Sequence, residues 1–286
     1  MVIKKNTNPP DLSVRDDGLI TPEVGDWAEQ KYRLLWNYAD LFATSMKNKW
    51  DERGYIDLFA GAGYARIRGT SRIVQSSSLL ALQVADPFDF YIFCDADSNR
   101  LASLRERAAR LKPVARCCFK NCDVNTSNRE IISELPPYGP KRKVLSFCFV
   151  DPYKMSDIKF STIQNLSSRF IDFLILIPAM DPIRDEATYY SETSNVVSDY
   201  LGNTAWRAAR RQDDPLSRFD LFITKSLDSQ MKSLGYIYGG LFETLMVRST
   251  KKNLPLYRLG FYSRNKLGER FWKDAKKYSD PQMSLF

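Results

Sequence analysis

Four short apolar runs of this 286-residue chain each lead to an aspartate, and this repeated pattern constrains the fold more than any other feature. The aspartates are Asp57, Asp95, Asp123 and Asp151. Short apolar runs of this kind are typical of strands that are buried on both faces of a parallel sheet. Because parallel strands end at one edge of their sheet, we expect these carboxylates to surround a pocket for a polar ligand.

The alternation of strand and helix patterns predicts the fold class. Strands are expected at residues 54–59, 89–94, 115–121, 143–150 and 170–177, with helical patterns between them. Such alternation indicates an α/β fold with a doubly wound, Rossmann-like and mostly parallel sheet. Residues 236–248 and 256–264 have the pattern of a C-terminal antiparallel hairpin, and a last helix is expected at about residues 265–277.

The chain divides into five expected segments. Residues 1–20 are expected to be a flexible arm, and residues 1–17 are polar and carry Pro9-Pro10, which argues against a signal peptide. Residues 21–180 form the ligand-binding core, which begins with a helix at about 26–48 and includes a loop at 64–75. Residues 181–234 read as a helical insertion, residues 235–278 complete the core with the hairpin and last helix, and residues 279–286 form a tail.

Charge and the absence of histidine restrict the function classes. The net charge of +8 favours an anionic partner, nucleic acid first, although ordinary solubility charge explains it equally well. The chain has no histidine, which excludes Ser-His-Asp and Cys-His nucleophile systems and His-ligated zinc. Any reaction must therefore use carboxylates, amines, phenols or positioning alone.

Cysteine usage and hydropathy predict a cytoplasmic protein. The 5 cysteines form an odd set within apolar runs, which argues against a disulfide framework. Cys117, Cys118 and Cys122 lack the paired spacing of a structural zinc site, so we expect no metal and interpret them as small buried side chains. No apolar stretch approaches the roughly 18 residues that a membrane span needs, so no membrane association is expected.

A glycine turn follows the first strand, in the run Asp57-Leu58-Phe59-Ala60-Gly61-Ala62-Gly63. Glycines at such a turn let the backbone approach a ligand closely. The third glycine of a dinucleotide fingerprint is missing, which disfavours a nicotinamide cofactor. The run resembles motif I of the S-adenosylmethionine (SAM)-dependent methyltransferases, in which the turn passes under the methionine part of the cofactor. This resemblance implies SAM as cofactor, with Phe59, Gly61 and Gly63 beside it and Asp57 either orienting the turn or contacting the cofactor's ammonium group.

The next two strand-ending aspartates suit the nucleoside part of that cofactor. A carboxylate at Asp95 can accept hydrogen bonds from two vicinal ribose hydroxyls. Asp123 suits the exocyclic amine of an adenine ring. Taken singly, each is better explained as a turn or capping residue, and it is the register of all of them that favours a ligand site.

Asp151-Pro152-Tyr153 follows the fourth strand, where the transferred group would lie. The tripeptide resembles the Asp-Pro-Pro-Tyr signature of amino-methyltransferases that act on adenine or cytosine. The resemblance implies that Asp151 and a backbone carbonyl hold the target amine, while the aromatic ring stacks on an extruded base. The second proline is absent here and Lys154 follows the tyrosine, so a simple strand-ending Asp-Pro turn is the alternative.

Basic residues near this edge could contact a polymer. Arg66, Arg68 and Arg72 lie in the loop after the glycine turn, and with Lys154 they could grip a phosphate backbone. A solvated charged loop is the alternative interpretation.

The last five residues, Gln282-Met283-Ser284-Leu285-Phe286, resemble the bacterial sliding-clamp-binding peptide. That peptide buries a Leu-Phe pair in a pocket of the clamp while its glutamine bonds at a second point. The resemblance implies partner-binding roles for Gln282, Met283, Leu285 and Phe286. A tail that packs on its own domain is the alternative.

Several motifs in order resemble the three-Cys-motif partner family over most of residues 20–286. They are Val24–Lys31, Tyr55–Gly63, Arg66–Thr70, Phe149–Tyr153, Asp172–Leu176 and Leu267–Lys273. The resemblance implies a bacterial, mobile-element or phage-associated protein. It also implies a separate partner with three cysteines that is similar to radical-SAM enzymes.

Two functions follow as expectations. The first is a SAM-dependent methyltransferase that acts on nucleic acid, DNA in preference to RNA, with a base amino group as target. The second is a non-catalytic adaptor on the same fold that links the three-cysteine partner to DNA or to the sliding clamp.

Overall fold

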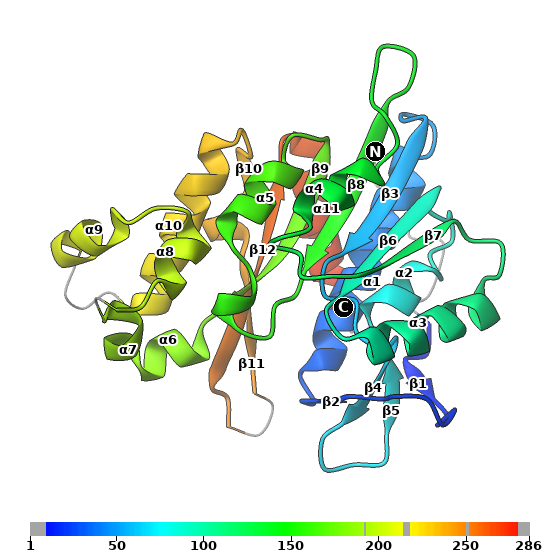
Figure 1. Ribbon diagram of the computed structural model, residues 1–286, viewed down its shortest axis with the longest axis horizontal. Helices are drawn as coiled ribbons and strands as arrows, with labels where there is room; N and C mark the ends of the chain where they lie inside the picture. The colour runs from blue at the N-terminus through cyan, green and yellow to red at the C-terminus, as the bar shows by residue number, and fades with distance from the viewer. Residues whose placement is uncertain (1–9, 192, 214–217, 250–251, 280–286) are drawn as a thin grey trace.

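The computed structural model describes residues 10–191, 193–213, 218–249 and 252–279 (Figure 1). Its centre is an eight-stranded sheet in the order β10-β12-β9-β8-β3-β6-β7, with β11 paired to β12 beside that path. The strands are β3 (Glu52–Asp57), β6 (Phe90–Asp95), β7 (Cys117–Asn121), β8 (Val144–Val150), β9 (Ile171–Pro178), β10 (Tyr238–Gly239), β11 (Leu245–Arg248) and β12 (Pro255–Ser263).

Strands β3, β6, β7, β8 and β9 are parallel, and β12 is antiparallel to β9. The predicted α/β class with a mostly parallel sheet and a C-terminal antiparallel addition is therefore confirmed. The expected strand at 236–248 is instead divided into β10 and β11 by a short 3-10 helix, η2 (Leu241–Glu243). The chain moves outward from β3 to β6 and β7, then returns to β8 on the other side of β3. This reversal is a topological switch point, where ligands bind at the carboxyl ends of the strands.

Helices cover both faces of the sheet because successive strand residues point to opposite sides. Tyr55 of β3 belongs to one buried cluster and its neighbour Ile56 to the other. The first cluster includes residues of α1 (Ala28–Met46), α2 (Ser77–Ala81), α3 (Ser98–Leu111) and α11 (Lys266–Ser279). The second includes residues of α4 (Asn128–Ser133), α5 (Phe160–Leu166), α8 (Val196–Leu201) and α10 (Phe219–Ser233). Each fully buried large side chain contributes about 1.5–3 kcal/mol relative to exposure.

The segment at 181–234 is helical as expected, with α6 (Met180–Arg184), α7 (Glu186–Tyr190) and α9 (Trp206–Gln212) in addition to α8 and α10. These helices lie to the left of the sheet in Figure 1. Tyr200 of α8 and Ile223 of α10 are buried in the second cluster together with sheet residues, so this segment shares the core of the protein. Among the described helices, none combines the length and the apolar character that crossing a membrane requires.

A second, four-stranded sheet lies below the central one in Figure 1. It is formed by β1 (Ser13–Val14), β5 (Ile73–Gln75), β4 (Tyr64–Ile67) and β2 (Glu23–Val24). The segment at 64–75, expected to be a loop, is therefore largely the β4–β5 hairpin. Hairpin pairing satisfies the backbone groups of this segment without a strongly apolar sequence.

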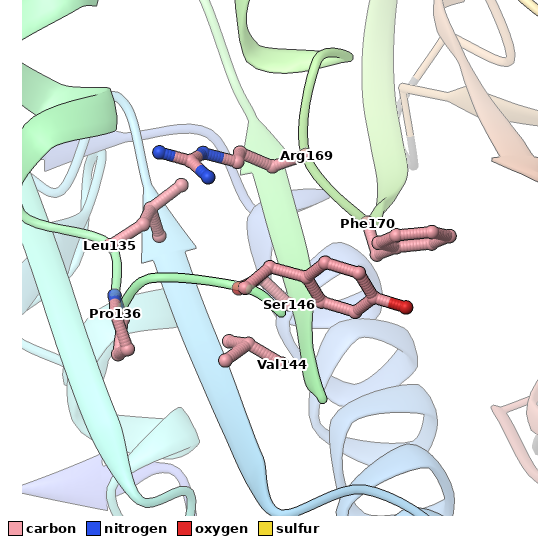
Figure 2. A pocket seen from close by; sticks show the side chains of 7 residues that line it. Leu135, Pro136, Val144, Ser146, Arg169 and Phe170 are labelled. Atoms are coloured by element: carbon pink, nitrogen blue, oxygen red, sulfur yellow. The ribbon is translucent and has the colours of Figure 1, made fainter. Parts of the chain in front are cut away.

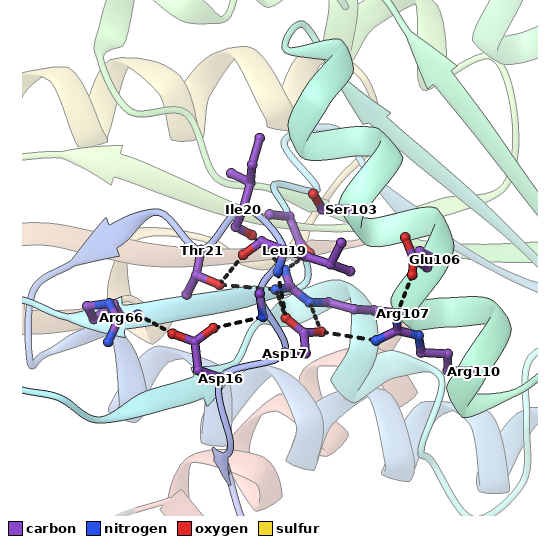
Figure 3. Close-up of polar contacts among 12 residues, drawn as sticks. Asp16, Asp17, Leu19, Ile20, Thr21, Arg66, Ser103, Glu106, Arg107 and Arg110 are labelled. Carbon is purple, nitrogen blue, oxygen red and sulfur yellow. Dashed lines mark hydrogen bonds and ion pairs between the residues drawn. The ribbon is translucent and has the colours of Figure 1, made fainter.

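Residues 10–20 also differ from the expected flexible arm. Ser13 and Val14 pair with β5, and the Asp17 carboxylate forms an ion pair with the buried Arg107 of α3 (Figure 3). The Arg107 guanidinium also donates to the backbone carbonyl of Ile20 at 2.7 Å and to the Thr21 hydroxyl at 3.0 Å. These bonds to one arginine hold a polar segment that has little apolar surface of its own. Residues 1–9 of the predicted arm lie outside the described residues.

Candidate functional site

A cavity of about 930 Å³ opens at the carboxyl ends of the parallel strands. Asp95, Asp123 and Asp151 all line it, although they come from three different strand ends. The N-terminal part of α1, the strand β2 and the start of β12 also line the cavity. The predicted convergence of carboxylates at one sheet edge is thus present for these three residues.

A second hollow, at the amino ends of the strands, is too small for a ligand (Figure 2). It measures about 10 Å³ and lies between Val144, Ser146 and Phe170. A space of this size is at the limit of what one water needs. The large cavity is therefore the candidate site.

Asp57 lies buried beneath the large cavity and supports the glycine turn. Its carboxylate accepts hydrogen bonds from the Phe59 N–H at 3.3 Å, the Ser78 hydroxyl at 3.2 Å and the Tyr55 hydroxyl at 3.3 Å. Burial raises the pKa of the Asp57 carboxyl to about 6, although hydrogen bonds from Ser77, Ser78 and the Phe59 N–H oppose this shift. Of the two roles considered for Asp57, the geometry fits the one that orients the turn.

The glycine turn is held from its other side by Asp95. The Asp95 carboxylate accepts the Gly61 N–H at 2.8 Å with one oxygen and the Asp97 N–H at 2.8 Å with the other. Gly61 has a φ of +63° and lines the cavity together with Phe59. Gly63, with a φ of +86°, faces the core instead, because a Cβ there would come within 3.0 Å of Leu79 and Leu104.

Asp123 is exposed at the third strand end, and one of its oxygens accepts the Asn125 N–H at 2.8 Å. Beside it, Cys122 also lines the cavity, and a hydrogen bond from the Cys94 thiol lowers the pKa of the Cys122 thiol to about 7. Across the described part of the chain, no group of three or more His, Cys, Asp or Glu side chains is placed to hold a metal ion.

Asp151 forms an ion pair with Lys31 of α1, with 2.5 Å between Nζ and Oδ2. Both side chains are largely buried, with exposed fractions of 10% for Lys31 and 16% for Asp151. Burial alone would lower the pKa of Lys31, but the adjacent Asp151 carboxylate outweighs it, so the net pKa of the ammonium is raised and Lys31 stays protonated.

Two tyrosine rings flank this ion pair. Lys31 Nζ lies 5.2 Å from the centre of the Tyr32 ring and 5.8 Å from that of Tyr257. Burial raises the pKa of the Tyr32 hydroxyl to about 12 and also raises the pKa of the Tyr257 hydroxyl, so both remain protonated. The sequence motifs indicated neither Lys31 nor Tyr257 as a site residue. The helical spacing around Lys31 shows only that it shares a face of α1, and nothing local identifies its partner.

Pro152, Tyr153 and Lys154 follow Asp151 along the edge of the cavity. Tyr153 is largely open to solvent, with an exposed fraction of 86%. The Lys154 N–H donates to the Asp157 carboxylate at 2.9 Å, which closes the turn into the short 3-10 helix η1 (Met155–Asp157).

The three predicted phosphate-binding arginines all pair with acidic residues of the N-terminal part of the chain. The N–O distances are 2.7 Å for Arg66–Asp16, 3.7 Å for Arg68–Glu23 and 2.6 Å for Arg72–Glu29. Of the three, Arg68 lines the cavity, and it is joined there by Arg100 of α3, which the motifs did not indicate. Exposed ion pairs of this kind are worth about 0–1 kcal/mol, so they leave these arginines able to exchange partners.

The predicted clamp-binding residues Gln282, Met283, Leu285 and Phe286 lie outside the described residues. Their role in partner binding stays a prediction.

No protein-family model matches the chain, and no curated protein matches its sequence. Solved structures with a similar fold include protein LPL1258 of Legionella pneumophila, which is 10% identical in sequence and has a TM-score of 0.49. The match covers 87% of this chain and 93% of that protein. An O-methyltransferase of Bacillus cereus in complex with SAH (S-adenosylhomocysteine) has 10% identity, coverages of 86% and 84%, and a TM-score of 0.46. Magnesium protoporphyrin IX methyltransferase of Synechocystis with bound SAH has 10% identity, coverages of 82% and 84%, and a TM-score of 0.42. At this identity the likeness is one of general chain path, and the resemblance to the three-Cys-motif partner family stays a prediction.

Proposed function

We propose that this protein is a SAM-dependent methyltransferase-like protein that acts on nucleic acid, with DNA favoured over RNA and a base amino group as target. The observation that carries the proposal is the meeting of a glycine turn with Asp95, Asp123 and Asp151 in one cavity of about 930 Å³. A volume near the upper end of the roughly 300–1,000 Å³ range of ligand sites suits a cofactor together with part of its substrate.

In the proposed complex the cofactor follows the sheet edge. The turn at Phe59 and Gly61 lies under its methionine part. Asp95 accepts hydrogen bonds from its ribose hydroxyls, and Asp123 accepts a hydrogen bond from its adenine amine. Each Asp95 oxygen already accepts one backbone N–H. A carboxylate offers about four acceptor positions, so Asp95 can hold the turn and the ribose together.

The proposed transfer requires chiefly correct positioning. The amine nitrogen attacks the methyl group of SAM, the bond from that methyl to sulfur breaks, and the nitrogen then loses a proton to solvent. Asp151 would accept a hydrogen bond from the amine and so orient its lone pair towards the methyl group. Neither step needs an imidazole, so the absence of histidine is no obstacle.

Charge supports a nucleic-acid target. The net charge is +8, and Arg68, Arg100 and Lys154 lie on the cavity lining. Arginine and lysine at the rim of a site position a phosphate backbone without reading its sequence. A three-cysteine partner protein and a bacterial sliding clamp are further proposed partners, and they rest on the motif resemblances alone.

One observation favours the adaptor as a second candidate. Asp151 is already paired with Lys31, so the residue expected to receive the target amine is partly occupied. An adaptor would bind SAM or nucleic acid without turnover.

The deciding experiment combines SAM titration by calorimetry with transfer of a labelled methyl group to DNA and to tRNA. The methyltransferase proposal expects SAM binding and a transfer that Asp151→Ala abolishes. SAM binding without transfer in the presence of the partner supports the adaptor. Absence of SAM binding overturns the cofactor assignment.

A further inference from the structure

The cavity lining also contains a tyrosine that the proposed methyl transfer does not use. Tyr257 lines the cavity, and its hydroxyl is buried and has no hydrogen-bond partner among the described residues. A buried polar group without a partner is costly, and native structures keep few of them. A ligand that enters the cavity can supply the missing partner.

Apolar residues of β9 and β12 share the cavity lining with Tyr257, which suits an uncharged ring. Leu176, Pro178 and Leu256 provide apolar surface on the same side of the cavity. The nearby Lys31 and Asp151 charges cancel each other, so the subsite favours a neutral group over an ion. Lys31 occupies one oxygen of Asp151 and leaves the other as an acceptor.

We propose that Tyr257 and Lys31 complete the subsite that holds the target base, an inference that rests on the proposed function. Lys31 is a positioning residue, because it fixes the Asp151 carboxylate so that its second oxygen meets the target amine. Tyr257 is a specificity residue, because its hydroxyl hydrogen bonds to the ring that carries that amine. The two residues come from α1 and β12, and Lys31 Nζ lies 5.8 Å from the centre of the Tyr257 ring.

Tyr257→Phe separates function from structure. It removes only a hydroxyl that is unsatisfied in the free protein, so the variant is expected to be as stable as the wild type or more stable. The matched control is Tyr262→Phe. Tyr262 lies on the same strand, is fully buried and also has an unpartnered hydroxyl within the described chain, but it does not line the cavity.

The test measures methyl transfer from labelled SAM to single-stranded DNA and RNA oligonucleotides that contain one adenine or one cytosine. Tyr257→Phe is expected to reduce kcat/KM about tenfold or more, the effect of losing one hydrogen bond in a dry site, with SAM affinity unchanged. Tyr262→Phe is expected to match the wild type. Lys31→Met should reduce kcat more strongly than it changes KM, and Lys31→Arg should restore part of it.

If the wild type binds SAM but transfers no methyl group, the affinity for the same oligonucleotides in the presence of SAH is measured in place of kcat/KM. The variants are then expected to differ from the wild type in affinity by the same factors. Equal values for Tyr257→Phe and Tyr262→Phe overturn the specificity role, and Lys31→Arg no better than Lys31→Met overturns the positioning role. In both cases the proposed function survives. A wild type that binds neither SAM nor oligonucleotide overturns the proposed function and this inference together.

Discussion

The Asp95 carboxylate, at the end of β6, accepts a hydrogen bond from the Gly61 N–H in the turn after β3, with 2.8 Å between the two atoms. Its second oxygen accepts the Asp97 N–H at the start of α3, also at 2.8 Å. One carboxylate therefore joins two neighbouring strand ends at the point where a cofactor would lie. This relationship makes Asp95 part of the frame of the site as well as a candidate ligand.

Asp95→Asn should weaken both roles. An amide offers one oxygen, so its NH₂ group must face one of the two backbone N–H donors. We expect a loss of about 1–3 kcal/mol of unfolding free energy and about 10–100-fold weaker SAM binding. The matched control is Asp97→Asn, which should be nearly neutral in stability because asparagine caps a helix as well as aspartate. Denaturant unfolding and calorimetry measure both quantities, and an Asp95→Asn variant that binds SAM as tightly as the wild type would contradict the prediction.

Gly61→Ala tests how closely the turn approaches the ligand. Gly61 has a φ of +63°, and a Cβ added there meets nothing within 4 Å, so the side chain would occupy open cavity space. Gly18 has a similar φ of +77° with equally open surroundings, but it does not line the cavity. Both alanine variants should lose about 1–2 kcal/mol from the left-handed backbone. Only Gly61→Ala should reduce SAM affinity, by about tenfold or more, and a similar loss in Gly18→Ala would count against a direct contact.

Arg107 links the N-terminal segment to the glycine turn, and Figure 3 shows its bonds to Asp17 and Thr21. Its guanidinium donates to both Asp17 oxygens at 2.9 Å and 2.6 Å and to the Ala62 carbonyl at 2.7 Å. Arg107→Met removes the donor to the Ala62 carbonyl and leaves the Asp17 carboxylate with only the Leu19 N–H at 3.2 Å and the more distant Arg110. We expect a loss of about 3–5 kcal/mol, together with faster hydrogen exchange at residues 11–24.

Arg110→Met is the control for this prediction. Arg110 lies on the same helix and 3.6 Å from the same Asp17 carboxylate, but its side chain is 54% exposed. Its loss should cost no more than about 1 kcal/mol. If the two variants lose similar amounts of stability, burial of the Arg107–Asp17 pair is not what holds the segment.

The strand ends could be predicted from the sequence because their information is local. A buried parallel strand is a continuous apolar run, and the residue that follows it must lie at the common edge. This is why Asp95, Asp123 and Asp151 were expected together and do line one cavity. The class of fold follows from the same runs and the helical patterns between them.

The rest of the site depends on contacts between distant segments. Lys31 and Asp151 are 120 positions apart, and Arg107 and Asp17 are 90 apart. Helical periodicity indicates that Lys31 shares a buried face, but not which carboxylate neutralises it. Residues 10–20 are polar and therefore suggest a free arm. Their ordered structure comes from contacts with α3 and β5, which the local sequence does not reveal.

Asp172 should make stability depend on pH in the direction opposite to most carboxylates. Burial raises the pKa of this carboxyl to about 7, although hydrogen bonds from Ser263 and Tyr38 and the nearby Arg264 charge lower it. The unfolded chain releases the same proton near pH 4. Between about pH 4 and pH 7 the folded state therefore binds more protons, and this group's contribution to stability falls as the pH rises. Below that window the contribution is constant, and above it the full cost of the buried charge is present.

Asp172→Asn removes this titration while it keeps an acceptor for the Tyr38 hydroxyl, which lies 3.4 Å from the carboxylate. We expect the stability of the variant relative to the wild type to increase by about 2–4 kcal/mol between pH 4.5 and pH 8, as judged from ~1.4 kcal/mol per unit of pKa shift. The raised pKa of Asp57 acts with the same sign, but it is present in both proteins and cancels in the difference. Urea unfolding at a series of pH values gives this difference directly. A constant difference across the window would mean that Asp172 is ionised in the folded protein throughout, and that Ser263, Tyr38 and Arg264 compensate its burial fully.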